Sequence, residues 1–289
     1  MKLQKVWMRV FVLVVACACA LVVAPRVAAF VETKEQPRSS VSAPASLPFE
    51  PAEQLVYEAE FSKLLLRGIK IAEFKFTAGR TDAAHTGPTK TAPHLFVGDI
   101  ESKGWFRKLF GINFHFRIES TVEPETFAVL RTKKLDEQGK RVRTSEALFD
   151  RAADRVAWKE IDPNDPRREP RIVNNPLGGA MHDVLSAIYF LRTQTLTPGK
   201  TFNLVLSDSG EIYHVPAKVV AEKKLMKTPV GKVSVVRVDV ELFGEHRPVE
   251  GKGEMSMWVT NDARRLPVRA KLSSDLGTLV ISLKSVQSK

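Results

Sequence analysis

Short runs in which apolar and polar residues alternate follow one another along most of the chain. The clearest run spans residues 112–118, where isoleucine and phenylalanine alternate with asparagine, histidine and arginine. A period of two places successive side chains on opposite faces of a β-strand. The same pattern predicts strands over residues 55–61, 68–77, 95–103, 112–118, 127–134, 141–149, 155–161, 201–206, 212–220 and 232–243.

The end of the chain, residues 251–283, contains three more alternating runs separated by two turn-like breaks. An N-D-A-R-R-L-P corner at residues 261–267 joins the first two of these runs. Short strands joined by tight turns are typical of an antiparallel β-meander, so the whole chain predicts about a dozen strands. This region contains no recognisable set of catalytic side chains.

Several breaks between the strands carry turn residues. Residues 79–93 predict a hairpin tip, residues 136–139 a hairpin loop, and residues 162–170 a long surface loop with three prolines. The alternation slips by one residue between Ile71 and Phe74, which predicts a β-bulge. Residues 105–110 fit either a helical turn or an extended connection.

The period changes once, between Ala180 and Thr193, where apolar residues recur at helical spacing. A helix with one apolar stripe must bury it, and we expect it to pack on an open end or face of the sheet. A parallel α/β fold is excluded, because its crossovers need many more helices. The predicted fold class is therefore all-β, mainly antiparallel, as a barrel-like or strongly curved meander with one packed helix.

Residues 1–29 have the organisation of an export signal. Three basic residues precede an apolar run over residues 10–24, and V-A-A at 27–29 offers the small side chains that signal peptidase requires. The run is shorter than the roughly 20 residues of a spanning helix. We expect an exported, most simply periplasmic, protein that is not integral to the membrane after signal cleavage. An uncleaved N-terminal anchor, a lipoprotein acylated at Cys17, and secretion stay open.

Residues 30–47 are rich in serine, proline and alanine, which predicts a disordered linker ahead of a single β-rich domain over residues 48–289. Both cysteines, Cys17 and Cys19, lie within the predicted signal. The mature chain is therefore expected to lack disulfides, thiolate catalysis and cysteine-bound metals. Its stability has to come from core burial.

The formal net charge is +11, and the basic residues are spread along the chain. Most basic clusters have an acidic residue close by, which is typical of solvated strand edges and loops. The alternative is a weakly basic face toward an anionic polymer, lipid headgroup or glycan. No nucleic-acid motif is present, so the candidate partners are a lipid, a glycan or an envelope protein, and the oligomeric state stays open.

The sequence assigns no catalytic residue, no cofactor and no metal. No two of the six histidines lie at i,i+2 on a strand or at i,i+4 on a helix. His182 and Asp183 fit either a general base oriented by a carboxylate or an exposed pair in the first helical turn. Ser186 lacks a G-x-S-x-G setting and a partner base. A Gly-Gly pair at 178–179 fits an anion site at the helix N-terminus or a flexible entry.

Four residues are candidates for ligand binding. Tyr189 and Arg192 are three apart and share a helix face, where they would supply the polar contacts of a cavity. As the structural alternative, Arg192 suits the helix C-terminal dipole. Trp258 lies on the less apolar face of its strand, as a ligand platform or a packing residue. Arg265 lies in the 261–267 corner, where the structural alternative is a salt bridge with Asp262.

Three groups of residues carry a family resemblance. They are Leu47-Pro48-Phe49 with Glu53, Leu55 and Tyr57; residues 183–192 (D-V-L-S-A-I-Y-F-L-R) with Thr197-Pro198-Gly199; and Gly253, Trp258, Asp262, Arg265, Pro267 and Gly277. With them, residues 48–285 resemble the DUF3108 family of exported bacterial proteins, a domain of unknown function. P-A-E at 51–53 departs from the more usual P-G-E turn. The resemblance implies a predominantly antiparallel, barrel-like β fold, and it implies no activity and no site residues.

Three hypotheses of function remain. The first is a non-enzymatic envelope protein that binds an amphipathic molecule or an envelope polymer in or on a β-barrel. The second is a structural or protein-interaction module of the envelope with a solid core. The third, which the sequence favours least, is a hydrolase acting on envelope glycan, since no spaced carboxylate pair stands out.

Overall fold

The computed structural model describes residues 47–81, 92–104, 107–108 and 111–288. The predicted signal (1–29), all but the last residue of the predicted linker (30–47), and most of the predicted hairpin tip and of the 105–110 segment lie outside these residues.

Fourteen strands and one complete helix lie within the described residues, in addition to the helical residues Gly104, Arg107 and Lys108. In chain order they are β1 (Gln54–Lys63), β2 (Leu66–Arg80), β3 (His94–Ser102), β4 (Phe114–Val122), β5 (Val129–Gln138), β6 (Arg141–Asp150), β7 (Arg155–Ile161), β8 (Arg171–Pro176), α3 (Val184–Thr193), β9 (Thr201–Asp208), β10 (Glu211–Thr228), β11 (Gly231–Val240), β12 (Gly253–Thr260), β13 (Pro267–Ser274) and β14 (Gly277–Gln287).

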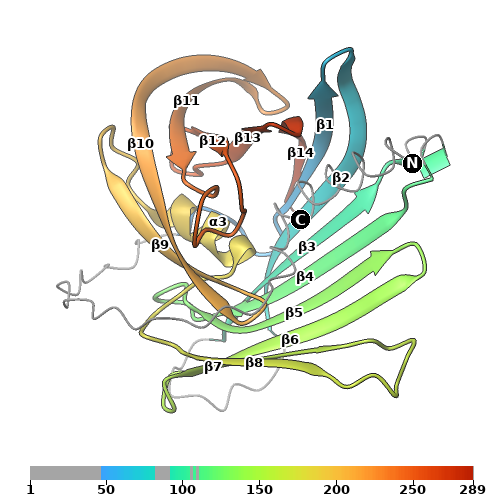
Figure 1. Ribbon diagram of the computed structural model, residues 1–289. Coiled ribbons are helices and arrows are strands. Elements are labelled where there is room, and N and C mark those ends of the chain that lie inside the picture. The colour runs from blue at the N-terminus through green and yellow to red at the C-terminus, as the bar shows by residue number, and fades with distance from the viewer. Residues whose placement is uncertain (1–46, 82–91, 105–106, 109–110, 289) are drawn as a thin grey trace.

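All fourteen strands belong to one sheet, in the order β8-β7-β6-β5-β4-β3-β2-β1-β14-β13-β12-β11-β10-β9. Each neighbouring pair is antiparallel. Two meanders, β1–β8 and β9–β14, are therefore joined side by side through the β1–β14 pair. Figure 1 shows that the sheet curls around the helix without closing. The predicted all-β, antiparallel, strongly curved fold with one packed helix is confirmed.

A short segment ahead of the helix bridges the two meanders where the sheet stays open. The Val129 N–H on β5 donates to the Met181 carbonyl at 2.9 Å. The His182 N–H donates to the Val205 carbonyl of β9 at 2.9 Å, and its own carbonyl accepts from Ser207 N–H at 2.8 Å. These bonds satisfy backbone groups that an open edge would leave without partners.

The contact between the two meanders at the open side of the sheet is called the seam. The β9–β10 turn reinforces the seam by packing against β7 and β8. Gly210 has φ +83°, and a Cβ there would lie 2.8 Å from Cβ of Val173 and 2.9 Å from Cβ of Trp158. The Gly210 carbonyl accepts from the side chain of Asn175 at 2.9 Å. Asp208, at the end of β9, forms a buried ion pair with Lys134 of β5. Glycine is required here by both conformation and space.

The helix lies inside the curl and contacts β3, β4 and β9 (Figure 1). Leu185 and Tyr189 join a central apolar cluster with β1–β4 and β11–β14, whereas Ala187 and Leu191 join a second cluster with β9–β12. A third cluster, which includes Trp158, lies under β5–β7. The apolar stripe is therefore buried against both meanders. No helix among the described residues is long and apolar enough to cross a membrane.

Three local predictions differ from the structure. The helix begins at Val184 rather than near Ala180, because Asp183 caps it and residues 181–183 are extended in the seam. The 136–139 loop is shorter than predicted, since β5 continues to Gln138 and Gly139 makes the turn at φ +60°. Strand β8 was not predicted. The predicted slip near Ile71 is confirmed, because the β1–β2 register shifts where Ala59 and Glu60 face Ala72 and Lys70.

Candidate functional site

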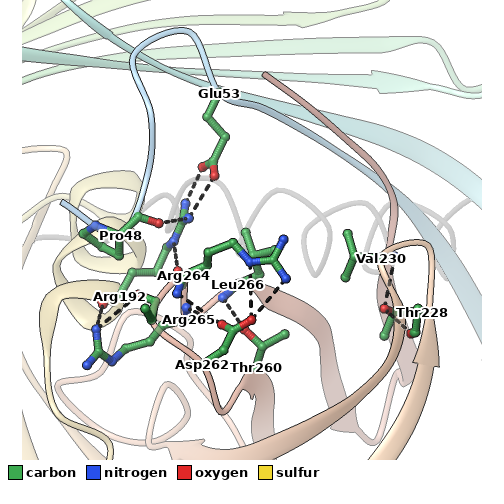
Figure 2. Close-up of polar contacts among 12 residues, drawn as sticks. Pro48, Glu53, Arg192, Thr228, Val230, Thr260, Asp262, Arg264, Arg265 and Leu266 are labelled. Carbon is green, nitrogen blue, oxygen red and sulfur yellow. Dashed lines mark hydrogen bonds and ion pairs between the residues drawn. The ribbon is translucent and has the colours of Figure 1, made fainter. Parts of the chain in front are cut away.

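A buried ion pair joins the start of the described chain to the helix (Figure 2). Arg192, in the last turn of α3, is 1% exposed, and its guanidinium contacts both carboxylate oxygens of Glu53, at 2.5 and 3.0 Å. Arg192 also donates to the Pro48 carbonyl at 2.7 Å and to the Arg264 carbonyl at 3.2 Å. A buried guanidinium is tolerated because bidentate pairing and further hydrogen bonds compensate its desolvation.

Aromatic rings enclose this ion pair. The Arg192 guanidinium carbon lies 5.6 Å from the Phe49 ring centroid and 5.4 Å from that of Tyr189. Tyr189 stacks on Phe96 with ring centroids 3.9 Å apart. Burial raises the pKa of the Tyr189 hydroxyl, so the ring stays neutral. The cluster combines cation–π contact with apolar burial, which is the environment of a structural junction.

The corner between β12 and β13 completes the junction (Figure 2). Asp262 accepts from the backbone N–H groups of Arg264 and Arg265, both at 3.1 Å, and pairs with the Arg264 guanidinium at 3.1 Å. Arg265 has φ +44°, and its guanidinium donates to the Arg192 carbonyl at 3.2 Å. The corner salt bridge is thus made by Arg264, while Arg265 binds the C-terminal end of the helix.

Three of the four predicted ligand-binding residues, Tyr189, Arg192 and Arg265, meet at this junction. The guanidinium groups of the two arginines contact protein groups there. Trp258, on β12, packs against the central apolar cluster. None of the four lines the interior cavity or the outer groove described below. Their role as ligand contacts remains a prediction.

The residues at the helix start are buried rather than exposed. Asp183 caps the helix by accepting from Ser186 N–H at 2.7 Å, and its second oxygen accepts from the Thr132 hydroxyl at 2.6 Å. The His182 Nδ1 lies 2.8 Å from the Phe127 carbonyl, and burial lowers the pKa of His182 to about 4. Asp183 therefore occupies the helix N-terminus that an anion would need, ahead of any site at the Gly-Gly pair.

His115 lies on the solvent face of β4 between two carboxylates. Its Nδ1 is 2.8 Å from Glu137 and its Nε2 is 3.3 Å from Asp99, which also pairs with Arg117 at 2.6 Å. Partial burial lowers the pKa of His115, but the hydrogen bonds to Glu137 and Asp99 outweigh it and raise the pKa. Both ring nitrogens are engaged, so this histidine has no free nitrogen to accept a proton from a substrate.

An apolar cavity of about 120 Å³ lies between the helix and the half of the sheet that contains β9–β14, β1 and β2. The helix lines it with Val184, Ala187, Ile188 and Leu191. The few polar side chains at the cavity are those of Tyr57, Asp208, Tyr213 and Arg269. An apolar cavity of roughly 150 Å³ holds benzene, so this one is too small for a lipid.

An open groove of about 600 Å³ lies on the other face of the sheet, over β4–β8. We call it the outer groove; its solvent-facing lining is Arg117, Glu119, Lys133, Leu135, Thr144, Glu146, Leu148, Ala157, Lys159, Ile161 and Ile172. Ligand sites typically enclose about 300–1,000 Å³. The outer groove has this size and the interior cavity does not.

Strand register arranges the outer groove in rows. Glu119, Lys133, Glu146, Lys159 and Ile172 face one another across β4–β8. The neighbouring rows carry apolar residues, with Leu148 opposite Ala157 on one side and Thr144 opposite Ile161 on the other. Directly opposed side chains on one sheet face lie close together. A charged row is therefore flanked by apolar side chains on both sides.

The charges of the outer groove are unevenly compensated. Glu146 pairs with Arg131, and Glu119 pairs with Arg117 at 2.9 Å. Lys133 and Lys159 are exposed, and neither has an ion-pair partner within the part of the chain that the structure describes. The two ammonium groups are therefore available to an anionic group, next to exposed aliphatic side chains.

Metal binding has no support in the described ranges, because no group of three or more histidine, cysteine, aspartate and glutamate residues there is arranged to hold an ion. The outer groove was missed by sequence reasoning. The signal was present, since leucine or isoleucine at positions 148, 161 and 172 lies on strand faces that otherwise carry charge. Only strand order shows that these positions are neighbours.

The family described as "Protein of unknown function (DUF3108)" matches residues 56–284 of the chain. No curated protein matches it significantly. Among solved structures, a β-barrel-like protein with the domain of unknown function DUF1849, from Brucella abortus, is similar with a TM-score of 0.53 at 7% identity, over 82% of this chain and 97% of that one. A Bacteroides fragilis protein with a YmcC-like fold gives 0.32 at 9% identity, over 86% and 100%. The first likeness supports the curled β fold.

Proposed function

The chain belongs to the DUF3108 family, and we propose that it is an exported, non-enzymatic envelope protein that binds an anionic amphipathic molecule or envelope polymer in the outer groove. The observation that carries the proposal is the groove itself. It has the volume of a ligand site, and exposed apolar side chains there flank two lysines that form no ion pair among the described residues.

The chemistry of the lining selects the ligand class. Leu148, Ile161 and Ile172 are exposed to solvent, so covering them with an apolar chain is favourable by about 25 cal/mol for each Å² removed from water. Lys133 on β5 and Lys159 on β7 lie on either side of Glu146, which is on β6 between them. An anionic headgroup or a repeating anionic polymer would contact both ammonium groups at once.

The non-enzymatic part of the proposal rests on the titratable groups. His115 is held between two carboxylates, and His182 is buried with its Nδ1 at a backbone carbonyl. A general base needs a free lone pair within reach of the substrate. Both nitrogens of His115 lie at carboxylates and the ring of His182 is buried, which weighs against a hydrolase that uses either histidine as its base.

The test is titration of the purified protein with lysophosphatidylglycerol below its critical micelle concentration, followed by native mass spectrometry. We expect a stoichiometric complex. Lys133→Ser combined with Lys159→Ser, and separately Leu148→Ser combined with Ile161→Ser, are each expected to weaken binding by roughly tenfold or more.

The matched controls are Lys227→Ser and Leu225→Ser, which make the same types of substitution at exposed positions of β10, outside the outer groove. Both should bind the lipid like the unchanged protein. Equal weakening by control and groove variants would contradict the proposed site. The absence of any complex, together with no lipid or glycan retained on protein purified gently from its own envelope fraction, would contradict the binding function.

The second candidate is a protein-interaction module, and it is favoured by the small interior cavity and by the free edge of β8. An exposed strand edge can accept a strand from a partner. A photo-crosslinking residue at Ile172, which is exposed on β8, separates the two functions. A single envelope protein cross-linked there, without ligand binding, would favour the interaction module.

A further inference from the structure

Three consecutive leucines form the tip of the β1–β2 hairpin. Leu64 is 87% exposed, Leu65 is 99% exposed and Leu66 is 43% exposed. The tip of the hairpin lies at the top of Figure 1, level with the arch of β10 and β11. The other exposed large apolar residues in the described ranges lie either on β6–β8 or singly, as Leu225 does. A contiguous exposed apolar cluster marks an interaction site.

The tip is preformed. Lys63 and Leu66 are register partners, and Gly68 N–H donates to the Ser62 hydroxyl at 2.9 Å. Leu64 has φ +51°, a region that a leucine enters at an energetic cost. Almost none of its side chain is covered in return. The leucines are therefore held out to solvent by defined backbone geometry.

Cations flank the leucines. The segment over residues 62–68 reads S-K-L-L-L-R-G and contains two basic residues and no acidic one. The Lys63 ammonium donates to the Asp275 carbonyl at 3.2 Å, which places it beside the tip. Arg67 is exposed, and no ion pair of its side chain is found within the described residues. Below it, Lys70 pairs with Glu58 at 2.8 Å.

We propose that this tip inserts into the headgroup–acyl boundary of an anionic lipid bilayer. Leucines that project from a narrow convex tip suit a soft apolar layer, and flanking cations suit anionic headgroups. A second copy of the chain would need a complementary apolar pocket. The outer groove is open and partly apolar, but its exposed lysines that form no ion pair among the described residues are cationic like the residues that flank the tip.

The proposal is independent of the outer groove, and a local probe tests it in the full chain. Leu65→Cys is labelled with the environment-sensitive dye NBD after Cys17→Ser and Cys19→Ser remove the natural thiols. With vesicles of phosphatidylethanolamine and phosphatidylglycerol, we expect about a threefold rise in emission at position 65. Leu225→Cys, labelled in the same way, is the matched control and should not change.

Position-specific labelling separates tip insertion from anchoring by the N-terminal apolar segment, because both labelled proteins carry that segment. Replacing Leu64 and Leu66 by serine in the Leu65→Cys protein should abolish the emission rise. An unchanged signal at position 65 with vesicles would overturn the proposal. An equal rise in emission at position 225 would also overturn it. The same holds for a rise at position 65 that occurs without vesicles and depends on protein concentration, because that rise would report contact with a second copy.

Discussion

The Glu53–Arg192 pair shows how single residues connect distant parts of this chain. The two residues lie 139 positions apart, yet their side chains are both buried and share two contacts. A buried ion pair adds little net stability, but removal of one partner leaves an uncompensated charge. Arg192 also donates to two backbone carbonyls, so the junction of helix, domain start and β12–β13 corner depends on its orientation.

We therefore expect Glu53→Gln to reduce the free energy of unfolding by about 3–5 kcal/mol. Urea denaturation followed by circular dichroism measures the change. Glu241→Gln is the matched control, because Glu241 pairs with Arg247 at 3.2 Å with an exposed carboxylate, and it should cost no more than about 0.5 kcal/mol. Similar losses in the two variants would contradict the role of the junction.

Two buried histidines make stability depend on pH. Burial lowers the pKa of His182 to about 4, and burial together with Arg80 lowers that of His94 to about 4. The unfolded chain, with pKa near 6.5, binds more protons than the folded one between these values. Stability should therefore fall as the pH falls from about 6.5 toward 4, by ~3 kcal/mol for His182 alone.

His115 acts in the opposite direction, because its raised pKa favours the folded state below that pKa. The diagnostic is therefore the difference between the unchanged protein and His182→Gln. Urea denaturation at pH 7.5, 6.0 and 4.5 should give a flatter curve for the variant. Parallel curves would show that His182 is not held neutral in the folded state.

At the level of single residues, the sequence predicted which groups share a face but not what they contact. Helical spacing places Tyr189 and Arg192 together, and both lie on the buried junction. Nothing in the pattern indicates Glu53 as the partner of Arg192, because that contact depends on β1 lying beside the end of the helix. The alternative of an exposed His182–Asp183 pair was wrong for the same reason, since β5 and β9 cover the two residues.

Among the elements, the β9–β10 turn depends on one glycine. Gly210→Ala adds a Cβ within 3 Å of two β7–β8 side chains as well as the backbone cost at φ +83°. We expect a loss of about 3 kcal/mol or more, with faster hydrogen exchange in β7 and β8. Gly199→Ala is the matched control: its φ is +88° and no atom lies within 4 Å of the added Cβ.

The control variant should lose only the backbone term, about 1–2 kcal/mol. The difference between the two variants measures the close approach across the seam. If both variants lose the same free energy of unfolding, the turn does not pack closely against β7 and β8 in solution.

Elements with strong alternation were predicted well, and elements set by tertiary contacts were not. Strand β4 was predicted from the alternation of apolar and polar residues, and Phe114, Phe116 and Ile118 are indeed all buried on one face. Strand β8 (R-I-V-N-N-P) has a short, mostly polar sequence, and it forms by pairing with β7 at the edge of the sheet. The start of the helix was misplaced because residues 181–183 pair with β5 and β9, which no local propensity reveals.

For the whole molecule, the pairing of β1 with β14 holds the two meanders in one sheet. Removing residues 277–289 would leave β1 and β13 unpaired in the middle of the sheet. It would also delete the buried side chains of Leu279, Ile281 and Leu283. Each buried aliphatic side chain contributes about 1.5–3 kcal/mol, so the loss matches the entire stability of a typical domain.

We therefore expect the truncated chain to lack a cooperative urea transition and to lose its near-ultraviolet circular dichroism. A chain shortened only by residues 288–289, which follow β14, should unfold like the unchanged protein. A cooperative transition in the longer truncation would show that the remaining strands fold without the β1–β14 pair.

On the export that we propose, the neighbouring positions of Gln54 and Gln287 would also set the timing of folding. A polypeptide that crosses a membrane from its N-terminus delivers β1 first and its partner β14 last. Until the whole chain has crossed the membrane, one edge of β1 has no partner, because β14 has not yet emerged. The time during which β1 can pair wrongly is therefore set by the translocation of more than two hundred residues. It does not depend on how fast any single hairpin closes.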